Sequence, residues 1–118
     1  MRTPILALGL ISTFAVAALP AQAETIGPAD AKAHVGQTVT VEAPVSAVHT
    51  GRSGVTFIDI GGRYPDSNFT AVIFAADVVK FPNVNALDGK TVAISGPVQL
   101  YQGRPEIVLK TADQLKAK

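Results

Sequence analysis

Three short segments of this 118-residue chain carry the side chains best suited to binding chemistry. Residues 50–54, 61–68 and 101–105 are rich in glycine, proline or small polar residues, which is typical of turns and loops. Their arginines offer cations for phosphate, and their tyrosines offer planar faces on which bases can stack. With one phenylalanine from an adjoining predicted strand, the candidate ligand-binding residues are Arg52, Phe57, Arg63, Tyr64, Tyr101, Gln102 and Arg104.

Residues suited to catalysis form no recognisable pattern. The carboxylates of Asp59, Asp66 and Asp77 are scattered, without the paired spacing of an acidic metal site. Two histidines do not assemble into a Ser/His/Asp arrangement, and the absence of cysteine excludes disulfides and thiolate zinc sites. We therefore expect no catalytic residues, no bound metal and no cofactor, and predict that the chain is not an enzyme.

The first 23 residues are typical of a cleavable export signal. Arg2 precedes an almost wholly apolar stretch at 5–19, and Ala21-Gln22-Ala23 fits a small-residue cleavage site. The apolar stretch is shorter than the roughly 20 residues of a membrane-spanning helix. An uncleaved anchor is the alternative. We predict a single mature domain at 24–118, periplasmic or secreted, with no membrane insertion after signal cleavage.

Cleavage would also change the charge balance. The ten Lys and Arg residues fall to nine because Arg2 is lost, which equals the nine Asp and Glu residues. A neutral protein lacks the bulk cationic field that attracts nucleic acid, so binding of a polyanion would need a local patch. Without cysteine, stability must come from the hydrophobic core alone. The mature chain of about 95 residues is long enough to form a compact domain with such a core.

Alternating apolar residues predict five strands. They lie at residues 37–50, 55–60, 69–74, 91–100 and 106–110. In the first, Pro44 cannot donate to a ladder and the apolar alternation slips after Ala47, which predicts a bulge or a bend where the strand changes sheets. A short helix is predicted at 75–81, with Val78 and Val79 facing inward.

Strand alternation also assigns the faces. Ile58 and Ile60 are expected to point inward, with Phe57 and Asp59 on the outer face, because an aspartate seldom enters a core unpaired. In the last two strands, the expected core residues are Val92, Ile94, Val98, Leu100, Ile107 and Leu109. Gly103 is expected to take a positive φ in the turn between them.

The predicted element order is that of a mostly all-β, five-stranded Greek-key OB-fold barrel with a short helix between strands 3 and 4. An SH3-like barrel is the main alternative, although it would not place a helix there. Several segments carry a resemblance to a known family: residues 39–45, 53–58, 61–65, 71–74 and 101–107.

Through these segments the chain resembles small bacterial exported OB-fold proteins related to the tRNA-anticodon-type nucleic-acid-binding domain. The chain departs from this pattern at Ala43-Pro44, where many relatives have a glycine early in strand 1. The resemblance implies a binding surface on strands 2 and 3 and the adjoining loops, where the candidate residues lie. Glu106 is expected to anchor the last turn rather than to contact a ligand.

We therefore predict an exported OB-fold binding module for single-stranded nucleic acid or another oligomeric ligand. The alternative is a periplasmic protein-interaction or scaffolding domain that does not bind nucleic acid. A third hypothesis, an OB-fold nuclease of the staphylococcal type, would need an acidic metal site that the sequence does not display. The neutral mature charge disfavours strong binding of nucleic acid.

Overall fold

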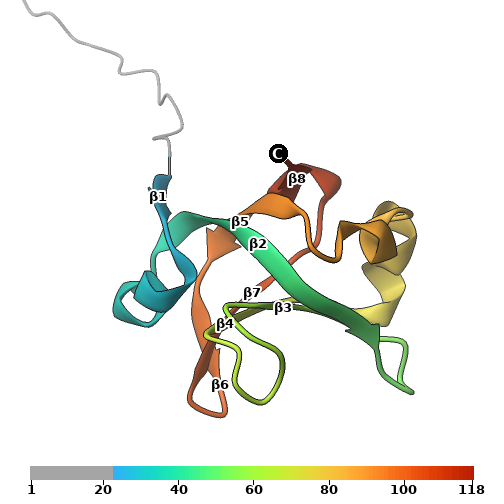
Figure 1. The fold of residues 1–118 in the computed structure, drawn as a ribbon, viewed down its shortest axis with the longest axis horizontal. Coiled ribbons are helices and arrows are strands. Elements are labelled where there is room, and N and C mark those ends of the chain that lie inside the picture. Colours follow the sequence, from blue (N-terminus) through green and yellow to red (C-terminus); the bar gives the residue numbers. More distant parts are fainter. Residues whose placement is uncertain (1–22) are drawn as a thin grey trace, which may run out of the picture.

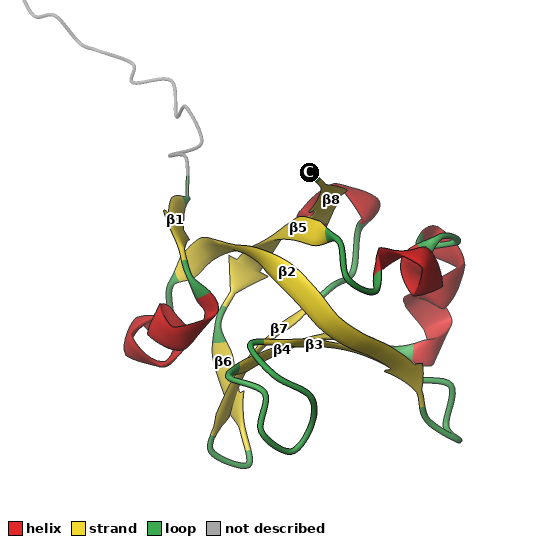
Figure 2. Ribbon diagram, in the orientation of Figure 1, coloured by secondary structure: helices red, strands yellow, loops and turns green. Residues whose placement is uncertain are grey.

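The computed structural model describes residues 23–118; the predicted export signal lies outside these residues apart from Ala23. The described chain is mostly β, as predicted, with eight strands and four short 3₁₀ helices (Figures 1 and 2). The strands are β1 (Glu24–Ile26), β2 (Thr38–Thr50), β3 (Thr56–Ile60), β4 (Phe69–Ile73), β5 (Thr91–Pro97), β6 (Gln99–Tyr101), β7 (Arg104–Val108) and β8 (Leu115–Ala117). The helices are η1 (Pro28–His34), η2 (Ala75–Lys80), η3 (Val84–Leu87) and η4 (Ala112–Gln114).

The strands form one sheet in the order β6-β7-β4-β3-β2-β5-β8, with β1 paired to β2. The pairs β1–β2 and β4–β7 are parallel, and the other pairs are antiparallel. The predicted five-stranded barrel is therefore wrong in detail, because the described chain has eight strands and its ladder stays open between β6 and β8. Strands β1 and β8 were not predicted, because three residues are too short for a periodic signal. The strand predicted at 91–100 is divided into β5 and β6.

The long strand β2 serves two halves of the sheet. Its first part, from Thr38 to Pro44, pairs with β5, whereas the part from Val45 onward pairs with β3. The register shifts between Val45 and Ala47, so the predicted irregularity next to Pro44 is confirmed. Figure 1 shows β2 sweeping across the whole fold as one curved ribbon. This bend brings β5 and β3 to opposite ends of a single strand.

The core confirms most of the predicted faces. Ile58, Ile60, Val92, Ile94, Ile107 and Leu109 have no solvent exposure, and Val98 is 2% exposed. Leu100 is 49% exposed, contrary to prediction, because the chain breaks strand pairing at Val98 and continues as the separate edge strand β6. Val79 is 82% exposed, also contrary to prediction. The helical segment lies where it was predicted, but it is a 3₁₀ helix whose tighter turn directs Val79 outward.

Gln114 joins two strands that no backbone ladder connects within residues 23–118. Its Nε2 donates to the carbonyl oxygens of Ser95 on β5, at 2.9 Å, and Val108 on β7, at 3.2 Å. Its Oε1 accepts from the backbone N–H groups of Lys110, at 2.7 Å, and Thr111, at 3.0 Å. One side-chain amide thus links β5, β7 and the segment before η4.

The close approach at Gln114 depends on Gly96 of β5. Its φ is +154°, and a Cβ there would lie 2.7 Å from Cγ2 of Ile107 and 2.9 Å from Nε2 of Gln114. Glycine lets the backbone pass at this distance. Both the amide link and the packing of Ile107 therefore require a residue without a side chain at position 96.

Two loops lie together at one end of the sheet. Figure 1 shows the loop at residues 61–68 and the β6–β7 hairpin side by side at the bottom of the view. Gly103 has the predicted positive φ of 79°, and Gln102 has a φ of 52°. The turn at 51–54 precedes β3, at the opposite end of that strand. Within the described residues, no helix has the length and apolar character needed to cross a bilayer.

Candidate binding groove

A row of polar side chains crosses four neighbouring strands. Strand register places Asp59 opposite Thr70, Thr70 opposite Glu106, and Glu106 opposite Gln99. Partnered residues in adjacent strands project to the same face, so these four side chains share the outer face of β3, β4, β7 and β6. We call them the polar row. Its two carboxylate residues are nearly buried, with Asp59 2% and Glu106 9% exposed.

An aromatic pair flanks the polar row on one side. His49 of β2 is opposite Phe57 of β3, two residues along the strand from Asp59. The rings of His49 and Phe57 stack, with centroids 5.1 Å apart and planes inclined by 22°. Together they form a flat platform beside the Asp59 end of the row.

Two tyrosines and an arginine flank the row on the other side. Tyr101 of β6 is opposite Arg104 of β7, two residues along the strand from Glu106 in the direction away from Phe57. The Arg104 guanidinium lies over the Tyr64 ring, 4.8 Å from its centroid. Tyr64 is 65% and Tyr101 60% exposed, so both rings have free surface on which a planar group could stack.

Asp59 fixes the position of one wall of the groove. Its Oδ2 accepts from the Tyr64 backbone N–H at 3.2 Å and lies 3.4 Å from Nε2 of His49. The loop is also held by the Gly62 N–H, which donates to Oγ of Ser46 at 3.0 Å. Gly62 has a φ of 118°, so a glycine suits this sharp path of the chain. One buried carboxylate therefore positions both His49 and the Tyr64 loop.

Glu106 performs a similar task on the hairpin. Its Oε2 accepts from Nε2 of Gln99 at 2.7 Å, which links β7 to β6 across the row. This contact matches the expected anchoring role of Glu106. Next to it, the Nη1 atom of Arg104 is buried without a hydrogen-bond partner among residues 23–118. The guanidinium thus retains donor capacity that the described chain does not use.

Three members of the polar row, Asp59, Thr70 and Glu106, line one groove together with the flanking rings, and its volume is about 430 Å³. Five of the seven predicted binding residues line it: Phe57, Tyr64, Tyr101, Gln102 and Arg104. Arg52 and Arg63 do not line the groove, so the expected convergence of three arginines is not found there. Arg52 lies in the turn before β3, and Arg63 is exposed on the loop beside Tyr64.

Sequence reasoning missed five lining residues: His49, Asp59, Thr70, Pro105 and Glu106. Asp59 was placed on the outer face, but its role in the groove depends on the loop that covers it. The outward alternation of His49 and Thr70 was a usable signal once the pairing of β2, β3 and β4 was known. The groove carries the carboxylates of Asp59 and Glu106 against the single arginine Arg104, so its floor is acidic.

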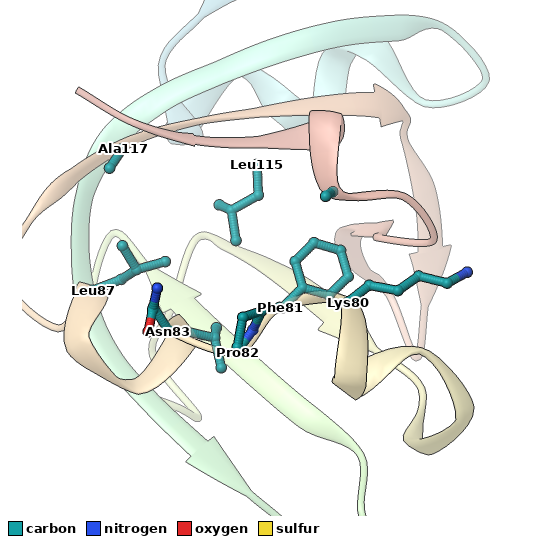
Figure 3. A pocket seen from close by; sticks show the side chains of 9 residues that line it. Lys80, Phe81, Pro82, Asn83, Leu87, Leu115 and Ala117 are labelled. Carbon is teal, nitrogen blue, oxygen red and sulfur yellow. The ribbon is translucent and has the colours of Figure 1, made fainter.

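A second hollow lies between the η2–η3 segment and β8, with a volume of about 230 Å³ (Figure 3). Its lining is mainly apolar, with Phe81, Leu87 and Leu115 directed toward it in Figure 3. The charged group of Lys80 is already bonded to Oδ1 of Asp77 and the carbonyl oxygen of Lys110. Residues 23–118 contain no group of three or more His, Cys, Asp or Glu side chains placed to hold a metal. The groove is therefore the stronger candidate site.

No family model and no curated protein matches this chain. Solved structures with a similar fold include OBody AM1L10 bound to hen egg-white lysozyme, with a TM-score of 0.60, 17% identity, and coverage of 80% of this chain and 93% of that chain. The asparaginyl-tRNA synthetase from Pyrococcus horikoshii matches with a TM-score of 0.54 and 18% identity over 73% of this chain and 20% of its own. The aspartyl-tRNA synthetase from Entamoeba histolytica matches with a TM-score of 0.56 and 15% identity over 98% of this chain and 28% of its own.

The chain thus spans between a fifth and three tenths of these two synthetases. At such low identity the likeness concerns the fold. It supports the predicted OB-type fold.

Proposed function

We propose that the mature chain is an exported binding module that holds single-stranded nucleic acid in the groove. The observation that carries this proposal is the arrangement of two ring surfaces on either side of the polar row. The His49–Phe57 pair lies on one side, and Tyr64, Tyr101 and Arg104 lie on the other. Alternating planar and polar surfaces are what stacked, unpaired bases require.

The dimensions of the groove suit a short stretch of single strand. The two ring surfaces are offset by four residues along the strands, because Phe57 is in register with Val72 and Val72 with Val108, and by two strands across the sheet, from β7 to β3. Four residues of extended strand span about 13 Å and two strand spacings about 10 Å, so the surfaces are about 16 Å apart. A stretch of a few nucleotides can therefore place one base on each surface, with the intervening polar row beneath it.

Charge sets the expected character of the binding. Arg104 is the only arginine or lysine among the lining residues, so the groove offers one cation to a phosphate. Each neutralised phosphate contributes a salt slope of about 0.7 for single strands. We therefore expect binding that is driven mainly by stacking, with a salt slope near one rather than the steep dependence of a cationic groove.

A periplasmic protein partner is the second candidate function. Strand β6 is at the edge of the sheet, and all three of its residues are exposed, including Leu100 at 49% and Tyr101 at 60%. An exposed edge strand with apolar side chains can pair with an extended segment of another protein. The OBody bound to lysozyme is a protein of the same fold in complex with a protein.

We further propose that the chain binds its ligand without catalysing a reaction, and that it is exported. The carboxylates that a metal-dependent nuclease would need lie apart, since Asp59 is in the groove whereas Asp77 pairs with Lys80 at 2.9 Å on η2. Support for export comes from the apolar stretch at residues 5–19 and the small-residue cleavage site at 21–23. Incubation with single-stranded oligonucleotides and Mg²⁺ or Ca²⁺ should leave the oligonucleotides intact; specific cleavage would contradict the non-catalytic part.

Calorimetric titration of residues 24–118 with a single-stranded DNA oligonucleotide of mixed sequence, at two salt concentrations, tests the function. Base–aromatic stacking is worth about 1–3 kcal/mol, so Tyr101→Ala should weaken binding about five- to a hundred-fold. Arg104→Ala should lower the salt slope by about 0.7, with little dependence on sequence.

The matched controls are Phe74→Ala, an exposed aromatic outside the groove, and Arg52→Ala. Both should bind as wild type does. Absence of binding by the wild type at low salt would refute the nucleic-acid function, and a protein partner for the β6 edge would then be the better explanation.

A further inference from the structure

The carboxylates of the polar row keep free acceptor atoms that face the groove. The recorded contacts of Asp59 and Glu106 use Oδ2 and Oε2, and within residues 23–118 neither Oδ1 nor Oε1 has a hydrogen-bond partner. Arg104 Nη1 is the one fully covered side-chain polar atom without a partner in the described chain, so these two oxygens are not completely covered. Both residues line the groove. Its floor therefore offers acceptors to whatever enters.

An ionised carboxylate accepts hydrogen bonds and cannot donate them. This property distinguishes the four bases by their Watson–Crick edges. Guanine presents two adjacent donors, N1–H and the N2 amino group, which match the two oxygens of one carboxylate. Adenine and cytosine present one amino group beside an acceptor nitrogen. Thymine and uracil present one N–H between two carbonyl oxygens, and these oxygens and a carboxylate repel each other.

Resting on the proposed nucleic-acid function, we propose that the groove selects guanine at the position stacked on the tyrosines, and that Glu106 reads its edge. Glu106 is next to the Tyr101–Arg104 pair in strand register, whereas Asp59 is two strands away. Neighbouring strands are about 4.8 Å apart, so roughly 10 Å separates the two positions and one base cannot use both.

The contacts of the two carboxylates also favour Glu106 over Asp59 as the residue that contacts the base. Asp59 already holds the Tyr64 N–H and His49, so it supports the wall of the groove. Glu106 has one protein partner, Nε2 of Gln99, and this bond fixes the direction of the carboxylate. Each carboxylate oxygen can accept two hydrogen bonds, so Oε2 can accept from a base while it keeps Gln99. Glu106 therefore has a fixed orientation and unused acceptor capacity.

Calorimetric titration with pentadeoxynucleotides tests the inference. The five probes are thymidine pentamers whose central position carries guanine, adenine, cytosine, thymine or hypoxanthine, the base that lacks the N2 amino group of guanine. The guanine pentamer should bind wild type about five- to a hundred-fold more tightly than the thymine pentamer, the range of a good bidentate contact. Hypoxanthine should lose most of that preference.

Glu106→Gln replaces one acceptor oxygen by a donor of the same shape and should bring the affinities for guanine and thymine together. The matched control, Glu42→Gln on β2, is outside the groove and should keep the preference. The hypoxanthine comparison uses wild type and does not depend on how a variant folds.

The outcomes separate the inference from the function on which it rests. Equal affinity of wild type for all five pentamers would overturn the guanine preference and leave nucleic-acid binding intact. A guanine preference that survives in Glu106→Gln would overturn the role of Glu106. If no pentamer and no longer oligonucleotide binds at low salt, the proposed function itself is refuted.

Discussion

Replacing Gln114 with alanine would remove the only side chain that joins β5 to β7 by hydrogen bonds in the described chain. Its Nε2 reaches the carbonyl oxygens of Ser95 and Val108, and its Oε1 receives the N–H groups of Lys110 and Thr111. Because no backbone ladder pairs these two strands, nothing else would replace the lost bonds at that position. The variant therefore tests whether a single amide holds the open sheet together.

These four hydrogen bonds contribute unequally to the free energy of unfolding. The two that reach Ser95 and Val108 are partly buried, whereas those from Lys110 and Thr111 are exposed and can be replaced by water. A typical intramolecular hydrogen bond contributes about 0.5–1.5 kcal/mol, and a buried acceptor left without a partner costs about 1–3 kcal/mol. We therefore expect Gln114→Ala to lower the free energy of unfolding by about 1–3 kcal/mol.

The Gln114→Glu variant tests the contribution of the side-chain donor separately from that of the side-chain acceptor. It keeps an oxygen for the Lys110 and Thr111 N–H groups but puts a second oxygen opposite the two carbonyls, so its loss should equal or exceed that of alanine. Urea unfolding followed by circular dichroism measures both, with an unchanged m value. Gln37→Ala, at an exposed glutamine, should stay within about 0.5 kcal/mol of wild type. A Gln114→Ala loss no larger than that of Gln37→Ala would refute the reasoning, as would a Gln114→Glu variant as stable as wild type.

Three further predictions concern the core, the close approach at Gly96 and the expected processing. Ile94→Ala and Ile107→Ala should each lower the free energy of unfolding by about 2–5 kcal/mol, because both side chains have no exposure; a loss below about 0.5 kcal/mol would contradict their place in the core. Gly96→Ala should cost at least about 1–3 kcal/mol through overpacking against Ile107, while Gly27→Ala, where a Cβ meets nothing within 4 Å, should be nearly neutral; equal urea midpoints would disprove the contact. Mass spectrometry of the exported protein should find Glu24 at the N-terminus, and a mature chain that retains Leu19 would exclude cleavage after Ala23.

The sequence predicted those features whose cause is local. Pro44 cannot donate to a ladder, and the slipped alternation after Ala47 is visible in the chain itself, so the bulge in β2 could be expected. Leu100 shows the limit of the same reasoning. Its alternation continues that of Val98, but its burial depends on whether the sheet extends over it, and β6 lies at the edge.

The residues of the candidate site also fall into two groups: those that local sequence predicts and those that depend on strand pairing. Tyr64, Tyr101 and Arg104 could be predicted because loop composition and residue type are readable without knowledge of pairing. Glu106 and Thr70 come together only through the parallel pairing of β4 with β7, which joins segments far apart in the chain. The exclusion of Arg52 and Arg63 from the groove likewise depends on the direction in which each loop leaves its strand, which composition does not specify.

Both tyrosines of the chain, Tyr64 and Tyr101, line the groove, and the sequence contains no tryptophan. All of the protein's tyrosine fluorescence therefore originates at the candidate site, with the Tyr64 ring in contact with the Arg104 guanidinium. A base or a partner side chain stacked on either ring would alter the emission without any attached dye. The unlabelled protein is in effect its own optical sensor, and a library of candidate ligands can be screened by a change in light alone.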